Sequence, residues 1–226
     1  MRKACVIGWP VAHSLSPALH GYWLKKYGIE GAYSAEEVQD ARLERWLKSM
    51  RAQGFCGCNV TTPHKAAVIP YLDEVDALAT SIGAVNTIMV EKGVLRGTNT
   101  DAFGFMENIR PYLSARNKAV VLGAGGAAKA VVKSLVDAGF SDVYVINRTE
   151  AKARALQDAY GDKVVTCDWE YRDEALADTD LLVNTTSLGL SGQPGLELDL
   201  SKLPAAAVVT GFVSGRMPAF SIVWYA

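Results

Sequence analysis

The chain has 226 residues, of which 50% are hydrophobic and 21% are charged, values close to the average of folded soluble domains. Its formal net charge is -1 and no apolar run approaches the roughly eighteen residues that span a bilayer, so we expect neither a nucleic-acid-binding protein nor a membrane protein. The four cysteines and three histidines show no metal-ligand spacing, and no signal peptide precedes the first strand. We therefore expect no metal, a cytoplasmic location and a small-molecule partner.

The first half of the chain alternates short apolar runs, which predict strands, with segments whose apolar residues recur at helical spacing. In chain order these elements are strand 4–7, helix 17–27, a strand that begins at 32, helix 42–50, strand 55–60, helices around 65 and over 73–82, the hairpin 87–90 and 94–97, and helix 101–109. The alternation predicts parallel strands joined by right-handed crossovers, with ligands at the carboxyl ends of the strands.

A break in this pattern separates two predicted domains. Residues 110–117 contain Pro111 and a polar cluster without sustained periodicity, so we place the boundary between residues 112 and 113. Beyond it the pattern begins again, with strand 118–122, a glycine-rich turn at 123–128, helix 129–138, strand 143–146, helix 150–160, and strands 164–166, 181–184 and 206–210. The predicted fold class is α/β, with an N-terminal α/β substrate domain (1–112) and a C-terminal Rossmann-like dinucleotide-binding domain (113–226).

A glycine-rich turn that follows a strand and opens a helix predicts a dinucleotide site. Its residues are Gly123, Ala124, Gly125, Gly126, Ala127 and Ala128, which match the GxGxxG/A fingerprint. In this fingerprint Gly123 permits the tight turn, and Gly125 lets the backbone approach a pyrophosphate at the helix N-terminus. The alternative is a tight strand-to-helix turn that binds no ligand.

The end of the next strand indicates which dinucleotide binds. An NAD site usually has Asp or Glu there to bind the ribose 2'-hydroxyl, whereas this chain has Asn147, Arg148 and Thr149. Arg148 can pair with a 2'-phosphate, and Lys152 lies one helical turn beyond it. These residues predict NADP as the cofactor. The alternative is that both cations are solvated residues at the start of a helix.

Two serines before the first helix predict an anion site in the first domain. Ser16 is expected as the N-cap with Pro17 behind it, so the hydroxyls of Ser14 and Ser16 would gather beside a helix N-terminus. This arrangement suits a carboxylate. Ordinary capping would explain Ser16 but would leave Ser14 unexplained.

Lys65 is the candidate proton carrier of the first domain. It is expected in the first turn of a helix, where the helix dipole disfavours the charged amine and so makes proton transfer easier. It follows a polar strand end at which Thr61 can bind a substrate hydroxyl, while Asn86 and Asp101 lie in two further polar turns. Asp101 can accept from a hydroxyl and hold Lys65. The alternatives are that Lys65 is an ordinary surface lysine, that Asp101 only begins a helix, and that Asn86 only shapes a turn.

Taken together, these motifs resemble the shikimate dehydrogenase family, and they occur in the order that the family has. The segments that carry the resemblance are 14–17, 59–65, 83–87, 99–101, 123–128, 147–149 and 184–187. Because the seven segments are spread over both predicted domains, the resemblance is specific.

The resemblance implies reversible reduction of 3-dehydroshikimate to shikimate by NADPH, in the route to chorismate and the aromatic amino acids. In the family pattern the residue that matches Lys65 handles the proton, and the residue that matches Asp101 binds a ring hydroxyl beside it. The serines would bind the carboxylate and the other residues the hydroxyls of the substrate. The implied substrate-binding residues are Ser14, Ser16, Thr61, Asn86 and Asp101.

The last part of the chain departs from the family pattern. After the strand that ends at 210, the family has an Asp and, three residues later, a Tyr, where this chain has Gly211 and Ser214. Residues 219–226 match nothing in the family, and the helix that returns to the first domain with a substrate-binding Gln is not expected. Two alternatives therefore stay open: a catalytically impaired NADP-binding protein with a sensing or interaction role, and an NAD-dependent quinate/shikimate dehydrogenase. We expect a monomer or a homodimer.

Overall fold

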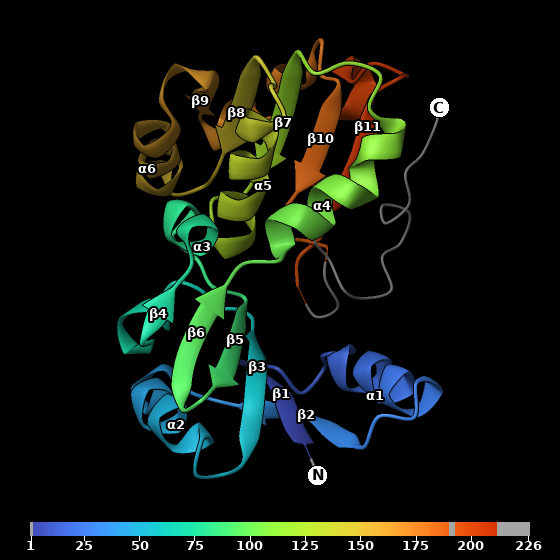
Figure 1. The fold of residues 1–226 in the computed structure, drawn as a ribbon. Coiled ribbons are helices and arrows are strands. Elements are labelled where there is room, and N and C mark those ends of the chain that lie inside the picture. The colour runs from blue at the N-terminus through green and yellow to red at the C-terminus, as the bar shows by residue number, and fades with distance from the viewer. Residues whose placement is uncertain (1, 190–192, 212–226) are drawn as a thin grey trace. The chain divides into compact units, whose positions relative to one another are not determined.

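The computed structural model describes residues 2–189 and 193–211, which fold as two compact units (Figure 1). The first unit is Met1–Thr100 and the second begins at Asp101, earlier than the predicted boundary at 112 and 113. The reason lies in helix α4 (Asp101–Ile109), whose Phe105 and Ile109 are buried in the core of the second unit. The proline-containing segment 110–117, at which the sequence predicted the boundary, therefore lies within the second unit.

A mixed sheet forms the centre of the first unit, with the strand order β2-β1-β3-β5-β6-β4 among the residues described. Its strands are β1 (Arg2–Gly8), β2 (Gly31–Glu37), β3 (Phe55–Val60), β4 (Glu74–Val75), β5 (Thr87–Glu91) and β6 (Val94–Thr98). Strand β1 pairs in parallel with β2 and β3, as the βαβ pattern predicts. Strand β5 is antiparallel to β3 and, through the hairpin, to β6, and β4 is too short to leave a pattern in the sequence.

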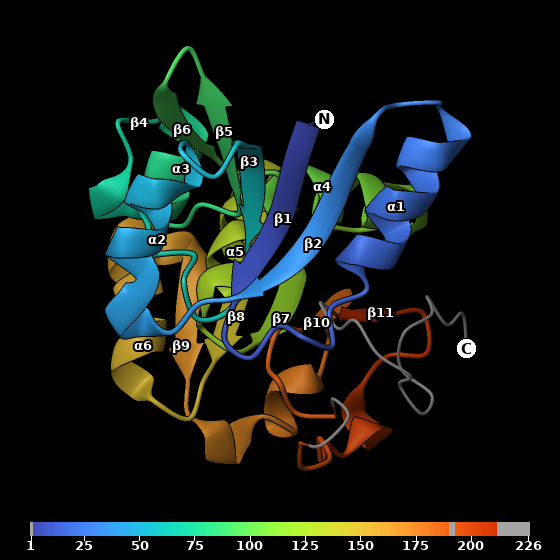
Figure 2. The ribbon, with the colours of Figure 1, turned by 90° about the horizontal axis from the view of Figure 1, so that it is seen from below.

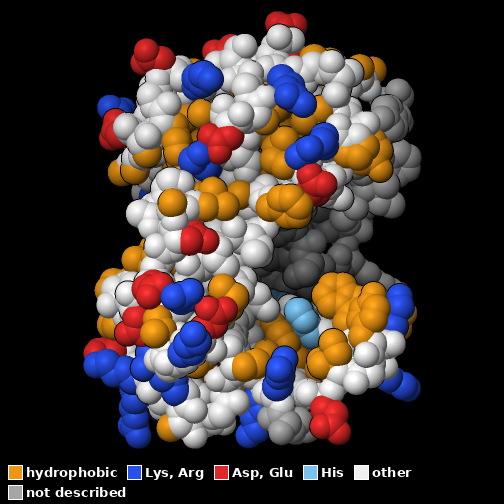
Figure 3. Space-filling model, viewed as in Figure 1, with side chains coloured by type: hydrophobic (Ala, Val, Ile, Leu, Met, Phe, Trp, Pro, Cys, Tyr) orange, Lys and Arg blue, Asp and Glu red, His pale blue; other side chains and the backbone are white. Residues whose placement is uncertain are grey.

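Helices α1 (Ser16–Lys26) and α2 (Leu43–Met50) pack on the sheet of the first unit, and α3 (Ala77–Ile82) follows β4. The buried residues of α2 join the main core of this unit, in which each fully buried aliphatic side chain contributes about 1.5–3 kcal/mol. Helix α1 lies over β2 (Figure 2) and buries none of its residues completely. Large apolar side chains on and directly after this helix are exposed, and hydrophobic side chains gather over α1 in Figure 3. The exposed residues are Leu19, Tyr22, Trp23 and Tyr27.

The helix expected around Lys65 is absent from the described structure. Residues 62–68 form consecutive turns, followed by the short 3-10 helix Ile69–Tyr71. Pro70 is the physical reason, because proline is tolerated in the first turn of a helix but interrupts a helix that runs through it. The prediction of a regular helix at this position was therefore wrong, and Lys65 lies in a turn.

A parallel sheet forms the centre of the second unit, with the strand order β11-β10-β7-β8-β9 in the part that the structure describes. Its strands are β7 (Lys118–Leu122), β8 (Asp142–Ile146), β9 (Val164–Cys167), β10 (Leu181–Asn184) and β11 (Val208–Gly211). All four strand pairs are parallel, which confirms the predicted α/β class. Ser214 and the segment 219–226, which depart from the family pattern, lie outside the described residues.

Apolar layers cover both faces of the second sheet. Helices α4, α5 (Gly126–Asp137) and α6 (Glu150–Tyr160) share one core with one face, and α4 and α5 are seen over this face in Figure 1. On the other face, Leu122 and Leu182 pack with Leu176 and with leucines of the segment 196–203. Because β8 and β10 flank β7, the strand order reverses at β7, and its carboxyl end is the switch point at which such sheets bind ligands.

None of the helices in the described residues is both long enough and apolar enough to cross a membrane.

Candidate functional site

The turn between β7 and α5 requires glycine at its first position. Gly123 has a φ of +106°, which side-chain-bearing residues rarely adopt, and a Cβ there would lie 2.5 Å from the Thr185 hydroxyl. That hydroxyl donates to the carbonyl of Leu122 at 2.7 Å, and the Gly123 N–H donates to Ile146 O at 2.8 Å. The turn is therefore held against both neighbouring strands, with no space for a side chain at Gly123.

The start of helix α5 can receive an anion. Gly125 is the N-cap and carries no side chain to cap the helix, and a Cβ built on it would meet nothing within 4 Å. The first N–H groups of a helix have no partners within the helix, so they can donate to a ligand in this open space. Helix α5 begins at Gly126, within the fingerprint, and the fully buried Ala128 lets it pack closely on the sheet.

Two cations follow strand β8. Asn147 donates from Nδ2 to the Thr149 carbonyl at 2.8 Å, which closes the turn before α6. The side chains of Arg148 and Lys152 are exposed and form no hydrogen bond or ion pair with any residue that the structure describes. By contrast, Arg154 on the same helix forms an ion pair with a glutamate one turn earlier. Arg148 and Lys152 are therefore the cations available to an anion at this strand end.

The two serines of the first unit lie at the start of α1, with a cap that differs from the predicted one. Leu15 is the N-cap, with no capping bond from its side chain, and Ser16 is the first helical residue. The Ser14 hydroxyl accepts from the Ser16 N–H at 3.2 Å. The prediction of Ser16 as N-cap was wrong, because Ser14 reaches the first helical N–H from outside the helix. Both serines are half-buried.

The turn that carries Lys65 is tied to its surroundings at two points. His64 is fully buried, and its Nε2 donates to the Val38 carbonyl at 2.6 Å. The carbonyl of Lys65 accepts from the Val85 N–H at 2.7 Å. The His64 Nδ1 lies 3.3 Å from a carboxylate oxygen of Asp40 and has no hydrogen-bond partner among the described residues. These bonds hold the backbone of the half-buried Lys65 without a helix.

Asn86 lies directly before β5 and is only 7% exposed. Its Oδ1 accepts from the Thr100 N–H at 2.9 Å, and its Nδ2 donates to the Thr100 hydroxyl at 3.0 Å. The Asn86 carbonyl accepts from the Val60 N–H at 2.8 Å. Thr61, the next residue along the chain, is half-buried and donates its N–H to Ile7 O at 2.9 Å. Asn86 and Thr61 are thus held at the same edge of the first sheet.

The structure brings the predicted polar residues of the first unit to one edge of its sheet. That edge holds the carboxyl ends of the parallel strands β1 and β3 and the beginning of the antiparallel strand β5. Asp101 is the first residue of the second unit, so its predicted place beside Lys65 stays a prediction. The residues at the edge are Ser14, Ser16, Thr61, Lys65 and Asn86.

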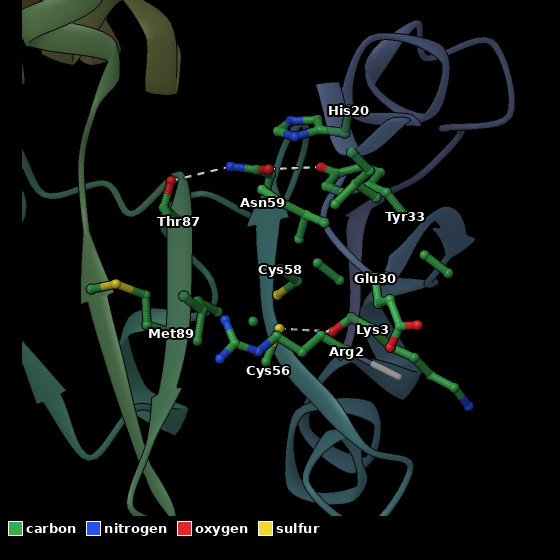
Figure 4. A pocket seen from close by; sticks show the side chains of 17 residues that line it. Arg2, Lys3, His20, Glu30, Tyr33, Cys56, Cys58, Asn59, Thr87 and Met89 are labelled. Carbon is green, nitrogen blue, oxygen red and sulfur yellow. Dashed lines mark hydrogen bonds between the residues drawn. The ribbon is translucent and has the colours of Figure 1, made fainter. Parts of the chain in front are cut away.

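Tyr33, which no sequence motif singles out, lies on β2 opposite Ala4 of β1. Its hydroxyl donates to Asn59 Oδ1 at 2.7 Å, and its ring stacks on His20 with the ring centroids 4.1 Å apart (Figure 4). The three residues line a cavity of about 290 Å³. Burial raises the pKa of the Tyr33 phenol above its usual range, so the phenol is a hydrogen-bond donor at neutral pH. The sequence holds no signal that Tyr33 would bond Asn59 or line a cavity, because a tyrosine in a strand is usual in any sheet.

The second unit carries a glycine-rich strand-to-helix turn on a parallel sheet, and the first unit is a separate domain with a polar strand edge. Together these features define the class of dinucleotide-binding α/β proteins that have a second domain. The family described as shikimate dehydrogenase substrate binding domain matches residues 6–88, and the family described as shikimate / quinate 5-dehydrogenase matches residues 107–190. The chain belongs to the shikimate dehydrogenase family, which confirms the resemblance in the sequence.

Similar proteins and structures agree with this assignment. The shikimate dehydrogenase (NADP(+)) of Paramagnetospirillum magneticum is 48% identical over 217 residues, which are 94% of this chain and 79% of that protein. The crystal structure of shikimate 5-dehydrogenase from Thermus thermophilus with NADP(H) and shikimate is 40% identical, with a TM-score of 0.80 over 92% of this chain and 77% of the other. Quinate dehydrogenase from Corynebacterium glutamicum with NAD is 32% identical, with a TM-score of 0.83 over 93% and 79%.

Alanine substitutions at Gly123 and Gly125 should have different effects, the first on stability and the second on dinucleotide binding. Gly123→Ala places a side chain at positive φ and against Thr185, so it should lower the free energy of unfolding by about 1–3 kcal/mol from backbone strain alone. Gly125→Ala meets no neighbour and should leave the midpoint of thermal unfolding nearly unchanged while weakening dinucleotide binding. Thermal unfolding and dinucleotide titration of both variants measure this. Equal losses of stability in the two variants would contradict the assigned roles.

Proposed function

We propose that this chain catalyses the reversible, NADPH-dependent reduction of 3-dehydroshikimate to shikimate, in the route to chorismate and the aromatic amino acids. The observation that carries the proposal is 48% identity, over 94% of the chain, to an enzyme named shikimate dehydrogenase (NADP(+)). The enzyme works in the cytoplasm as a monomer or homodimer, with shikimate as its small-molecule substrate.

The residues of the second unit fit NADP. The diphosphate would bind at the N-terminus of α5, in the open space over Gly125, with Gly123, Ala124, Gly126 and Ala127 completing the turn. The 2'-phosphate would bind Arg148, whose planar guanidinium suits a bidentate contact, with Asn147, Thr149 and Lys152 beside it. A carboxylate at this position would select NAD by repelling a phosphate. NADPH, when bound, supplies the hydride for the ring ketone.

The polar edge of the first unit suits a hydroxylated carboxylic acid. Ser14 and Ser16 lie at the N-terminus of α1, where hydroxyl and N–H donors favour a carboxylate. Thr61 and Asn86 offer a hydroxyl and an amide to the ring hydroxyls, and Asp101 offers a carboxylate that accepts from one of them. Each ring substituent therefore has a side chain of matching hydrogen-bond character.

Lys65 and Asp101 do the chemistry that the chain itself supplies. Reduction leaves a negative charge on the former ketone oxygen, and the ammonium of Lys65 donates the proton that neutralises it. In the reverse direction the amine accepts that proton from the substrate hydroxyl. Asp101 binds the neighbouring ring hydroxyl and so orients the ring toward Lys65. The bonds of His64 and of the Lys65 carbonyl keep the turn in place.

A direct assay of the wild-type chain tests the proposal. NADPH absorbance should rise when NADP+ and shikimate are mixed with the protein, and the rate should be much lower with quinate or with NAD+. Tight NADP binding without turnover would point to a sensing or interaction protein. Faster turnover of quinate with NAD+ would point to a quinate/shikimate dehydrogenase instead.

Arg148→Ala should change the choice of cofactor. Loss of a charge-assisted bond to the 2'-phosphate should weaken NADPH binding about tenfold or more, while NADH, which lacks that phosphate, should bind within about twofold of the wild type. Fluorescence titration with both cofactors measures this. Arg154→Ala is the matched control, because Arg154 is exposed on the same helix and is already paired. Equal weakening of both cofactors by Arg148→Ala would show that Arg148 supports only the fold.

Lys65→Ala should remove the proton carrier. We expect the turnover number for shikimate to fall by about 10²- to 10⁴-fold, with the dissociation constant of shikimate within a few-fold of the wild type. Steady-state kinetics and equilibrium binding separate the two quantities. Lys25→Ala, an exposed lysine on α1, serves as the control and should leave both unchanged. Near-normal turnover in Lys65→Ala would refute the catalytic role.

A further inference from the structure

Strand β2 lies at one edge of the first sheet and pairs only with β1 among the residues that the structure describes (Figure 2). It has seven residues, whereas the edge strands β4, β9 and β11 have two to four. Within the described ranges, no backbone hydrogen bond outside the ladder with β1 involves β2. The N–H and C=O groups on the outer side of such a strand can bond another strand.

The sequence of β2 lacks the features that most often block an open edge. Proteins protect such edges with proline, lysine, a bulge or a very short strand. The seven residues of β2 include neither proline nor lysine, and their register with β1 has no shift. The charged residues, Glu36 and Glu37, lie together at one end of the strand. They therefore favour one direction of pairing over the other without blocking the edge along its whole length.

Four charged residues near this edge form no ion pair with any residue that the structure describes. Strand β1 begins with Arg2 and Lys3, and β2 ends with Glu36 and Glu37. Glu36 accepts a hydrogen bond from the Ser34 hydroxyl, and the other three side chains are exposed. Because β1 and β2 are parallel, the two cations lie beside the start of β2 and the two carboxylates lie at its end. A single chain therefore keeps these opposite charges apart by the length of the strand.

Two copies of β2 can pair antiparallel about a two-fold axis through Ser34. In this register Glu37 of one copy lies opposite Gly31 of the other, and Glu36 lies opposite Ala32. Residues that are opposite each other in an antiparallel pair point to the same face of the sheet. The acidic end of each strand therefore lies beside two residues that have no side chain or a short one.

The same register brings the carboxylates toward the two cations of β1. Gly31 is the register partner of Arg2, and Ala32 is the register partner of Lys3. Neighbouring strands lie about 4.8 Å apart, so the backbone of each glutamate would lie about 10 Å from the backbone of a cation. The long side chains of Arg2 and Lys3 can close this distance across the small residues between them. Pairing of two copies thus joins charges that have no partner in one copy.

A groove between α1 and the start of β2 supports the same arrangement. It has a volume of about 650 Å³, and Lys25 and Glu30 are the charged residues among those that line it. Lys25 is exposed and forms no ion pair within the part of the chain that the structure describes. Glu37 lies four residues after Tyr33, whose ring stacks on α1, so its side chain points to the same face as this groove. The groove therefore offers Glu37 of a second copy a further cation.

We propose that this chain forms a homodimer in which the β2 edges of two copies pair antiparallel, with Glu36 and Glu37 of each copy facing Arg2, Lys3 and Lys25 of the other. The interface is isologous, so each favourable contact occurs twice. The two-fold axis is perpendicular to the sheet, which places α1 of both copies on the same face of one continuous sheet. The proposal concerns the first unit alone and does not depend on the proposed function.

Analytical ultracentrifugation of the wild-type chain tests the association itself. The chain should sediment as a dimer that dissociates to a monomer on dilution. A chain that stays monomeric at every concentration would overturn the proposal and leave the edge to a different partner. Assemblies larger than a dimer would also overturn it, because two-fold pairing occupies the β2 edge of both copies.

Charge reversal tests which residues face each other. Glu36→Lys combined with Glu37→Lys should raise the dissociation constant of the dimer about tenfold or more, because like charges then meet at both ends of the interface. Arg2→Glu combined with Lys3→Glu should do the same. A dissociation constant that neither double variant changes would overturn the proposal.

A control for net charge uses two exposed carboxylates of the second unit. Asp158→Lys combined with Asp162→Lys changes the net charge by the same amount as the reversal at the end of β2. The dissociation constant of the dimer should stay within about twofold of the wild type. A loss of affinity as large as that of the β2 variant would show that net charge alone governs association, and would overturn the proposal.

A mixture of the two charge-reversed chains separates lost charge pairing from misfolding. In a heterodimer of these chains opposite charges meet at both ends of the interface, whereas like charges meet at both ends of either homodimer. Native mass spectrometry, which distinguishes the three dimers by mass, should therefore show mainly the heterodimer. Its dissociation constant should lie within a few-fold of the wild type. No preference for the heterodimer would overturn the proposal.

A cross-link tests the position of the two-fold axis. Ser34 lies opposite its own copy in the proposed register, so Ser34→Cys should form a covalent dimer under mild oxidation. The background is Cys56→Ser, because Cys56 is exposed and free. Ser81→Cys, at an exposed position of α3, is the control and should stay unlinked. A Ser34→Cys chain that does not link, or that links no more than the control, would overturn the proposed pairing.

Discussion

The second unit depends on one close approach, at the turn that follows β7. Because Gly123 has no Cβ, Thr185 can come near enough to donate to Leu122, and this bond joins the ends of β7 and β10. The chain then enters α5 directly, so the N-terminus of that helix lies at the switch point of the sheet. The place of the proposed diphosphate site therefore follows from the absence of one side chain.

The first unit is proposed to bind a ligand of different chemistry, with hydroxyls and a carboxylate in place of phosphates. Its edge is built from side-chain amides and hydroxyls that orient one another, and from a turn held by His64. A backbone cradle binds any diphosphate, whereas each oriented amide distinguishes a donor from an acceptor. In the proposed function, the second unit therefore provides anion binding and the first unit provides selectivity for the substrate.

The sequence was most informative where the pattern is local. Strands β7 and β10 and helix α6 have the bounds predicted from apolar runs and helical spacing, because a buried parallel strand and an amphipathic helix leave those patterns in consecutive residues. The turn around Lys65 and the cap before Ser16 were predicted incorrectly. At Lys65, Pro70 and a bond from the distant Val85 decide the backbone, and at the cap a neighbouring hydroxyl, that of Ser14, bonds the first helical N–H in place of Ser16.

The sequence by itself determined the alternation of strands and helices in both units, the dinucleotide fingerprint and the two cations proposed to bind the 2'-phosphate, because each of these leaves a pattern in neighbouring residues. Only the tertiary structure decided that α4 belongs to the second unit and that hydrogen bonds join Tyr33 to Asn59 and Asn59 to Thr87. The physical reason is that these two bonds join residues 26 and 28 positions apart, and a hydrogen bond across a sheet leaves no mark in the local sequence.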